Sequence, residues 1–259
     1  MCQLLGVCAN QEVDIIFSFR EWRHRGKSNP HGYGFAHWEG GTLRVVKEAS
    51  NLYDADSKAT RTREVTAARS RVFLGHVRYA TVGRRDGNNT HPFAASAGAR
   101  SFAFAHNGTV LDVKKWPLRK QRPQGDTDSE HAFLWLLEHL ADEPEDLFAR
   151  RLKDLADDIR TRGIPTLQRF NFLMSDGSTL WAYADNSLYF IERKPPYGGE
   201  LVRLVEDGYA IGLAQVKRPE ERAVLIATKP LTDEPSWEPL GTGELLVVRD
   251  GHVQTRIGP

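Results

Sequence analysis

Large and small residues alternate along several short stretches of the chain, and this period of two predicts β-strands. The clearest stretch is Ser101–His106, whose alternation is expected for a strand that lies between two packed layers. Residues 35–38 and 43–46 are also strand-like, and they flank the turn residues Glu39–Thr42. Two strand patterns around so short a turn predict a β-hairpin.

Strand patterns dominate the last hundred residues. Residues 170–174 and 180–184 predict a second hairpin, and residues 188–191 are expected to extend it. A further strand-rich group comprises residues 224–228, 244–248 and 252–255. The proline-containing loop around Trp237–Pro239 connects the strands of this group.

A period near 3.6 predicts helices in other parts of the chain. Residues 13–22 read as a short helix capped by Asn10 or Asp14, and the charged region 51–70 reads as an exposed helix. Residues 131–140 form a strongly amphipathic segment, and Thr127 and Glu130 before it have the spacing of a capping box. A longer helix is expected from Asp142 to Gly163, with an apolar stripe of Leu147, Leu152, Leu155 and Ile159.

The order of these elements is strands, then helices, then strands, which favours an α+β fold. We expect two antiparallel sheets that face each other beneath helical layers. The sequence has no repeat, low-complexity tract or linker that would divide it, so a single domain over residues 1–259 is predicted.

Composition narrows the classes of function. Thirty-five basic residues against 34 acidic ones leave a net charge of +1, which supplies no general attraction to nucleic acid or to an anionic membrane. The two cysteines, Cys2 and Cys8, form neither a disulfide framework nor a CxxC metal motif. There is no apolar run of membrane-spanning length and no basic leader, so we expect a cytoplasmic protein whose partner is a small molecule or another protein.

The second residue is the first candidate for chemistry. Removal of Met1 would place a thiol and a free amine together on Cys2. An α-amine with a pKa of roughly 7.7 to 8 can accept the thiol proton near neutral pH, which activates the sulfur for acyl transfer. The alternative is that Cys2 is a small apolar residue opening a buried strand.

Three further positions admit both a structural and a functional interpretation. Arg78 lies where the strand predicted within residues 71–81 ends, and its guanidinium could bind a substrate carboxylate or pair with a carboxylate of the protein. Asn107 and Gly108 have the sequence of a hairpin turn, but the Asn107 amide and the Gly108 backbone N–H could also form an oxyanion hole. Asp128 belongs to an acidic cluster at a helix start and could bind a substrate ammonium.

In this order the motifs resemble one family, the class II glutamine amidotransferases, whose domains are N-terminal-nucleophile hydrolases. The opening segment is most similar to the short, stand-alone bacterial members. The resemblance is carried by Met1-Cys2, Gly75-His76-Val77-Arg78-Tyr79-Ala80-Thr81, Thr90-His91-Pro92-Phe93, His106-Asn107-Gly108 and Gly125-Asp126-Thr127-Asp128-Ser129-Glu130.

This resemblance implies a four-layer αββα sandwich and a role for each motif. Cys2 would attack the γ-carboxamide of glutamine, and its own amine would serve as the base. The tetrahedral oxyanion would be stabilised by Asn107 and Gly108. The substrate would be bound through its α-carboxylate by Arg78 and through its α-ammonium by Asp128, in a pocket also lined by Tyr79, Thr81 and His91. No metal or other cofactor is implied.

Two features depart from the family pattern. Many relatives carry an acidic residue in the glycine-containing loop where this chain has Pro30–Gly34. The chain also has no recognisable second domain to accept ammonia, so a separate synthase partner is one expectation. Hydrolysis of glutamine is the first hypothesis for function. The alternatives are hydrolysis of a larger γ-glutamyl amide, as in low-molecular-weight thiol synthesis, and a non-catalytic regulatory scaffold.

Overall fold

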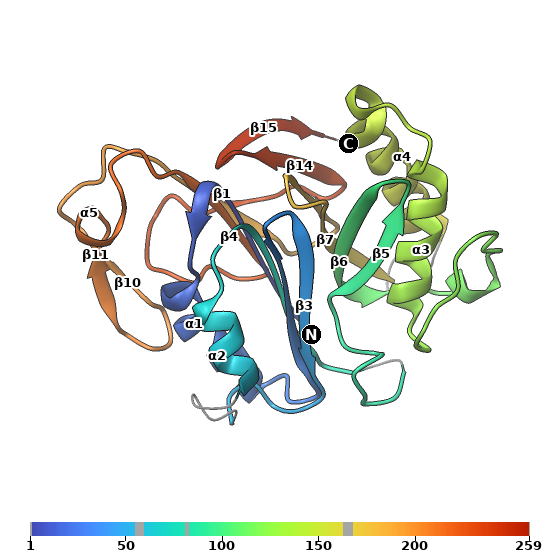
Figure 1. The fold of residues 1–259 in the computed structure, drawn as a ribbon, viewed down its shortest axis with the longest axis horizontal. Coiled ribbons are helices and arrows are strands. Elements are labelled where there is room, and N and C mark those ends of the chain that lie inside the picture. The colour runs from blue at the N-terminus through green and yellow to red at the C-terminus, as the bar shows by residue number, and fades with distance from the viewer. Residues whose placement is uncertain (1, 55–59, 81–82, 163–167, 259) are drawn as a thin grey trace.

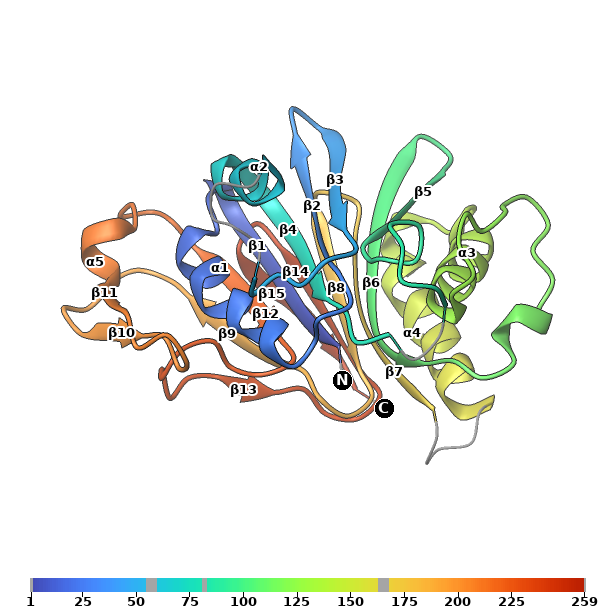
Figure 2. The ribbon, with the colours of Figure 1, turned by 90° about the horizontal axis from the view of Figure 1, so that it is seen from below.

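Two antiparallel β-sheets face each other and are covered on their outer sides by helices (Figures 1 and 2). The computed structural model describes residues 2–54, 60–80, 83–162 and 168–258. The α+β sandwich predicted from the element order is thus confirmed. Part of the expected helix 51–70, residues 55–59, lies outside the described ranges, as does Gly163.

The first sheet has seven strands, with the N-terminal strand near its centre. In spatial order it contains β13 (Glu238–Pro239), β9 (Tyr189–Arg193), β12 (Ala223–Ala227), β1 (Gln3–Val13), β4 (Ser70–Val77), β2 (Tyr33–Glu39) and β3 (Thr42–Glu48). Gln3 pairs with Val77, so the residues that precede β1 lie beside those that follow β4. This register decides where Cys2 lies.

The second sheet has six strands and packs against the first. In spatial order it contains β15 (His252–Ile257), β14 (Glu244–Arg249), β8 (Thr179–Ala184), β7 (Arg169–Ser175), β6 (Arg100–Thr109) and β5 (Phe93–Ala97). Strand β6 packs against β1 and β4 across the interface between the sheets. The start of β1 and the end of β6 therefore lie at the same side of the sandwich.

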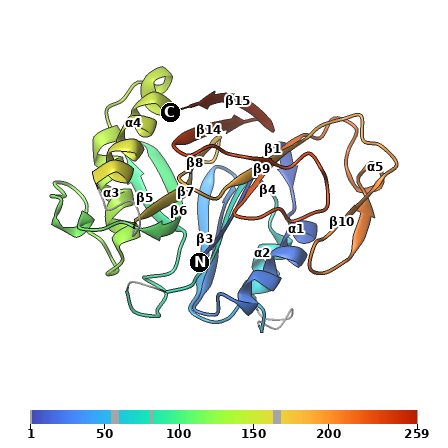
Figure 3. The ribbon, with the colours of Figure 1, turned by 180° about the vertical axis from the view of Figure 1, so that it is seen from behind.

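Helices form the two outer layers. The first sheet is covered by α1 (Ile16–Trp22) and α2 (Thr60–Ala67), and the second by α3 (Asp128–Leu140) and α4 (Glu145–Arg162), which Figure 3 shows from behind. Smaller elements are the 3-10 helices η1 (Arg23–Lys27) and η2 (Val113–Lys115), and a hairpin of β10 (Leu201–Arg203) and β11 (Ala210–Gly212) followed by α5 (Leu213–Val216). None of the helices in the described ranges combines the length and apolar composition needed to cross a membrane.

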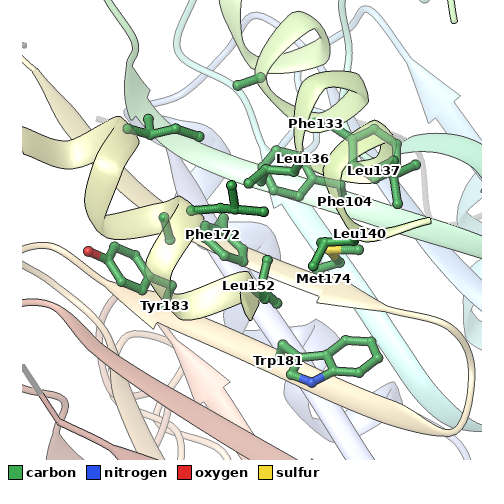
Figure 4. Close-up of a cluster of buried hydrophobic side chains, with 14 of the residues drawn as sticks. Phe104, Phe133, Leu136, Leu137, Leu140, Leu152, Phe172, Met174, Trp181 and Tyr183 are labelled. Carbon is green, nitrogen blue, oxygen red and sulfur yellow. The ribbon is translucent and has the colours of Figure 1, made fainter. Parts of the chain in front are cut away.

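The alternation predicted for Ser101–His106 sorts its side chains between two cores. Phe102 and Phe104 of β6 pack under α3 and α4. Figure 4 shows Phe104 among the side chains of this cluster. Ala103 and Ala105 point the other way, into the core between the sheets. Burial of each phenylalanine contributes roughly 1.5–3 kcal/mol, and the alanines leave room for the side chains of the facing sheet.

Several sequence-based assignments are wrong because long-range strand pairing is not visible in local patterns. Asn107 and Gly108 do not form a hairpin turn, since β6 runs through both of them to Thr109 and pairs with β7. Residues 188–191 do not extend the second hairpin. Residues 189–191 belong to β9, which pairs with β12 in the opposite sheet. The expected group of C-terminal strands is accordingly divided between the two sheets.

Two helix assignments also need correction. Strand β1 continues to Val13, so α1 begins only at Ile16, and its N-cap is Ile15 rather than Asn10 or Asp14. The Asp14 carboxylate still accepts a hydrogen bond from the Ile16 N–H at 3.2 Å. On α4, Leu147 was expected in the apolar stripe but is 51% exposed, and the neighbouring Phe148 is buried in its place.

Candidate active site

Cys2 lies at the entrance to β1, beside the segment that follows β4. The Tyr79 N–H donates to the Cys2 Sγ at 3.2 Å, and the thiol donates to the Tyr79 carbonyl at 3.4 Å. One backbone residue thus holds the sulfur from two directions. The position of Tyr79 follows directly from the register of β1 against β4.

Burial raises the pKa of the Cys2 thiol, and the Tyr79 backbone only partly offsets this effect. The thiol is therefore protonated at neutral pH. A sulfur in this state needs a base at the moment of attack, because the thiolate is the nucleophile. An adjacent terminal amine is suited to that task.

Arg78 follows β4 directly and is buried. Its guanidinium donates to the Arg84 carbonyl at 2.9 Å and to the Gly83 carbonyl at 3.5 Å. Burial lowers the pKa of Arg78, but an arginine remains charged at neutral pH. Its backbone carbonyl accepts from the His31 N–H at 3.1 Å, so the loop with the unusual His31 lies directly against this arginine.

His31 belongs to the loop that departs from the family pattern. Its Nδ1 accepts a hydrogen bond from the Ala80 N–H at 2.9 Å, and its ring lies 5.0 Å from the ring of Tyr79, centroid to centroid. His31 therefore supports the two residues that follow Arg78. Burial, with the cations Arg85 and Arg78, lowers the pKa of His31, so Nδ1 is free to accept at neutral pH.

Strand β6 brings Asn107 and Gly108 to the same side of the sandwich as Cys2. The Asn107 Nδ2 is buried and has no hydrogen-bond partner within the described part of the chain. An unpartnered buried donor is costly, at about 1–3 kcal/mol, so its presence calls for a ligand or an ordered water. A negatively charged oxygen of a reaction intermediate is one such ligand.

Gly108 adopts a conformation that only glycine tolerates easily. Its φ is +154°, and a Cβ at this position would lie 1.9 Å from the Arg169 carbonyl oxygen. The backbone of β7 therefore approaches β6 more closely here than any side chain allows. This close approach explains why a glycine occurs inside a strand.

Asp128 is the first residue of α3, after the N-cap Thr127. The Thr127 hydroxyl accepts from the Glu130 N–H at 3.2 Å, but the Glu130 carboxylate binds the Gln124 and Gly125 N–H groups, so only half of the predicted capping box forms. The Asp128 Oδ2 accepts from the Val110 N–H at 2.6 Å, which fixes the carboxylate beside the end of β6. Its remaining lone pairs can accept from an ammonium.

His106 and Ser129 join these elements, although the sequence motifs predict a role for neither of them. The His106 Nε2 lies 3.0 Å from the Arg169 carbonyl and its Nδ1 lies 2.8 Å from the Ser129 hydroxyl. A carbonyl only accepts, so Nε2 carries the proton and Nδ1 accepts from Ser129. Burial lowers the pKa of His106, in keeping with this neutral tautomer. Each of the two residues is adjacent in sequence to a proposed site residue. This adjacency is the signal by which the sequence could have identified them.

His91 is buried, and within the described residues both of its ring nitrogens lack a hydrogen-bond partner. Its ring centroid lies 4.1 Å from that of His76. Burial lowers the pKa of His91 well below its usual value and that of His76 to about 3. Both imidazoles are therefore neutral at physiological pH.

A single small cavity brings most of these residues together. It is lined by Cys2, Arg78, Tyr79, Ala80, His91, His106, Gly108, Thr127, Asp128 and Ser129, and its volume is about 20 Å³. Asn107 does not line it but neighbours Gly108 on β6. Thr81, the remaining expected pocket residue, lies outside the described ranges. Of the lining residues, Ala80, His106, Thr127 and Ser129 were not assigned to the pocket from the sequence.

The cavity admits about one water-sized molecule. A complete glutamine does not fit this volume, so the lining side chains must move apart to admit one. In the described part of the chain, no group of three or more His, Cys, Asp or Glu side chains is placed to hold a metal ion.

Comparison with solved structures supports the same architecture. The chain is similar over 98% of its length to a predicted glutamine amidotransferase of Pseudomonas aeruginosa, with 26% identity, full coverage of that chain and a TM-score of 0.70. The glutamine phosphoribosylpyrophosphate amidotransferase of Bacillus subtilis has a TM-score of 0.60 over 96% of this chain and 47% of its own. At 16% identity the latter likeness concerns the fold alone.

Sequence relatives extend over nearly the whole chain. An uncharacterized protein of Methanocaldococcus jannaschii is 36% identical over 98% of this chain and 70% of its own. YafJ of Escherichia coli, provisionally designated a glutamine amidotransferase, is 33% identical over 94% of this chain and 96% of its own. The family model "Glutamine amidotransferases class-II" matches residues 1–258. The chain therefore belongs to the class II glutamine amidotransferases.

Proposed function

We propose that this protein hydrolyses the γ-carboxamide of glutamine through a γ-glutamyl thioester on Cys2 and releases glutamate and ammonia. The observation that carries the proposal is the meeting of Cys2, Arg78, Gly108 and Asp128 around one cavity. These groups supply a nucleophile, a fixed cation, a backbone donor and a fixed anion. Free glutamine presents a partner for each.

The cation and the anion would recognise the zwitterionic end of the substrate. Arg78 would bind the α-carboxylate through its guanidinium fork, and Asp128 would bind the α-ammonium. Hydrogen bonds to charged groups contribute about 1.5–3 kcal/mol each, which is enough to select a free amino acid over an uncharged amide. Tyr79, Thr81 and His91 would line the rest of the pocket.

The reaction would proceed in two steps. The Cys2 amine, once Met1 has been removed, takes the thiol proton as the sulfur attacks the γ-carbon. The Asn107 amide and the Gly108 N–H stabilise the oxyanion, and the C–N bond breaks as the amine returns the proton to the departing ammonia. Water then attacks the thioester carbon, the C–S bond breaks, and glutamate leaves with the thiol restored.

The size of the cavity bears on the leaving group. A volume of about 20 Å³ is too small for any γ-glutamyl substrate, so the cavity must open before glutamine or a larger γ-glutamyl amide can bind. Glutamine is the substrate that we favour, because its leaving group is ammonia and it needs the least additional space. The ammonia would pass to an acceptor on a separate synthase partner or be released to solvent.

The test is the intact mass of the protein before and after incubation with 6-diazo-5-oxo-L-norleucine, a glutamine analogue that alkylates such nucleophiles. We expect a protein that lacks Met1 to gain one adduct, and Cys2→Ala to gain none. Release of ammonia and glutamate from glutamine should follow the same pattern. A correctly processed protein that gains no adduct and leaves glutamine intact would overturn the proposal.

A further inference from the structure

Asn171, a buried residue of β7, lies directly opposite Asn107 in the strand register. Its side-chain Nδ2 donates to the Asn107 backbone carbonyl at 3.2 Å and to the Asn186 Oδ1 at 2.8 Å. Both protons of the amide are therefore used. One of them binds the backbone carbonyl of Asn107, whose side chain is proposed to stabilise the oxyanion.

The other end of the same amide is equally engaged. The Asn171 Oδ1 accepts hydrogen bonds from the backbone N–H groups of Asp185, Asn186 and Ser187, at 2.9, 3.0 and 3.2 Å. These three donors belong to the turn that follows β8. With acceptors on one side and donors on the other, the orientation of the Asn171 amide is determined by its surroundings.

The Asn107 carbonyl and the Gly108 N–H are parts of one peptide group. A trans peptide is planar, and its C=O and N–H point in opposite directions. The carbonyl points toward Asn171 on β7, so the Gly108 N–H points away from β7. Strand pairing places the Asn171 backbone N–H on this carbonyl, and the Asn171 side chain adds a second bond to it. Bonds that fix the carbonyl also fix the direction of the N–H.

Strand β7 does not bind the Gly108 N–H, so this N–H can donate to a ligand in the cavity. Phe170, which is opposite Gly108, donates its own N–H to the Asp185 carboxylate at 3.1 Å, so the Phe170 amide points away from β6. In an antiparallel ladder the N–H and C=O of a residue point to the same side, so Phe170 and Gly108 form a pair without backbone hydrogen bonds. The Gly108 N–H is directed to the opposite side, where Gly108 lines the cavity with Cys2.

We propose that Asn171 is a positioning residue, whose side chain adds a second hydrogen bond to the Asn107 carbonyl beside the ladder bond from the Asn171 backbone N–H, and so aims the Gly108 N–H at the oxyanion. The inference rests on the proposed hydrolysis of glutamine at Cys2. It assigns to β7 a part in catalysis although β7 contributes no side chain to the cavity. Donors of an oxyanion hole act only if they are aimed in advance, and an error of about 1 Å can cost on the order of 10²-fold in rate.

A purely structural role for Asn171 makes a different prediction. If the amide only held the turn 185–187, its loss would lower stability and leave the chemical step intact. If it aims the Gly108 N–H, its loss lowers kcat with little change in KM, because the oxyanion exists only after substrate has bound. The two roles are therefore separable by kinetics.

The experiment compares Asn171→Ala and Asn171→Asp with a matched control on the same turn, Asn186→Ala. Aspartate retains the acceptor for the turn but replaces the Nδ2 donor by an oxygen facing the Asn107 carbonyl. We expect both Asn171 variants to lose about 10- to 100-fold in kcat for glutamine, with KM within about twofold of wild type. Asn186→Ala should keep the wild-type kcat while sharing any loss in melting temperature.

The outcomes separate this inference from the proposed function. An active wild type whose folded Asn171 variants retain kcat, or change only KM, would overturn the positioning role alone. Equal losses of kcat in Asn186→Ala would assign the effect to the turn and overturn it as well. Two Asn171 variants that both fail to fold would make the residue a structural brace. A wild type that neither hydrolyses glutamine nor reacts with 6-diazo-5-oxo-L-norleucine would instead remove the proposed function and this inference together.

Discussion

The two walls of the cavity are held in very different ways. The strand wall, residues 106–108 of β6, is braced by β7 and by the start of α3, and its residues His106 and Asn107 are buried. The loop wall consists of residues 78–80 after β4, supported by residues 83–85. Its Arg78 is buried, but the wall is more open at Tyr79, which is 43% exposed. The supporting Arg84 pairs with Asp86 and Asp126 at 3.9 and 3.7 Å, between exposed side chains. Ion pairs of this kind contribute about 0–1 kcal/mol.

This difference matches the tasks that the two walls would perform. An oxyanion hole must be aimed before the reaction begins, which suits a strand inside a sheet. A recognition wall must let glutamine into a cavity that now holds about one water molecule, which suits a loop. We therefore expect changes on the strand wall to act mainly on kcat, and changes on the loop wall to act mainly on KM.

Gly108→Ala should have the largest effect and tests the rigidity of the strand wall. The added Cβ would lie 1.9 Å from the Arg169 carbonyl, so β6 and β7 must separate at this point. Loss of one oxyanion donor costs about 10²–10³ in kcat, and the strained φ adds about 1–3 kcal/mol of instability. Steady-state kinetics with glutamine and thermal melting would measure both effects.

Gly198→Ala is the matched control, because a Cβ at Gly198 would meet no heavy atom within 4 Å. It should retain wild-type kcat and melting temperature. A Gly108→Ala protein with near-normal kcat would show that the strand wall can adjust, and the contrast between the walls would then lose its basis.

Arg78→Lys tests the loop wall and should act on binding. Lysine keeps the positive charge but lacks the planar fork that binds a carboxylate through two donors. The expected loss of about 1.5–3 kcal/mol corresponds to a rise of roughly 10- to 100-fold in the KM for glutamine, with a smaller change in kcat. Arg85→Lys, on the exposed part of the same loop, should leave both constants unchanged. A fall in kcat at constant KM would place Arg78 among the groups that act on the transition state.

Acid should weaken the buried core beside the strand wall. His76 of β4 is fully buried, and burial lowers its pKa from about 6.5 to about 3. Between these values the unfolded chain binds a proton that the folded chain does not, so stability falls as pH falls, by up to about 1.4 kcal/mol per pH unit for this residue. That slope corresponds to a tenfold change in the unfolding equilibrium per pH unit.

Urea unfolding at pH values from about 7 down to about 4 would measure this slope. His76→Gln should be less stable at neutral pH but should show a shallower dependence on pH, because it has no imidazole to titrate. An unchanged slope in the variant would mean that other groups carry the acid sensitivity of the core.

Features that depend on residues close together in the sequence were predicted more successfully than features that depend on distant residues. The alternation of Phe102, Ala103, Phe104 and Ala105 and the N-cap at Thr127 were predicted correctly, because each depends on a few adjacent residues. The family resemblance selected residues that the structure brings together around Cys2.

Features that depend on distant strands were not predictable in this way. The sequence Asn107-Gly108 is typical of a turn, yet pairing with β7 keeps it in a strand, and only tertiary structure reveals Asn171 opposite it. The same holds for β9, whose apolar pattern does not specify which sheet it joins. His31 was noted only as a departure from the family pattern, because its contact with Ala80 joins residues 49 positions apart.

His31 should have the smallest effect and gives the finest test of the loop wall. Its Nδ1 accepts from the Ala80 N–H, and a typical hydrogen bond contributes about 0.5–1.5 kcal/mol, so His31→Ala should lose roughly 2- to 10-fold in kcat/KM at pH 7. His31→Gln, whose amide oxygen can accept in its place, should recover part of this loss. Recovery by glutamine would separate the hydrogen bond from the ring contact with Tyr79.

The pH dependence of kcat/KM in the wild type and in His31→Ala tests the same hydrogen bond. Burial and the neighbouring cations Arg85 and Arg78 all disfavour the protonated ring, so wild-type His31 holds Ala80 at neutral pH and releases it only once the pH falls below its lowered pKa. Other titrating groups affect the wild type and His31→Ala alike, so the ratio of their kcat/KM values isolates this histidine. The ratio should be several-fold at pH 7 and approach one as His31 becomes protonated. A ratio that stays constant across the pH range in which an NMR titration shows the His31 ring becoming protonated would show that the loop wall is held without this hydrogen bond.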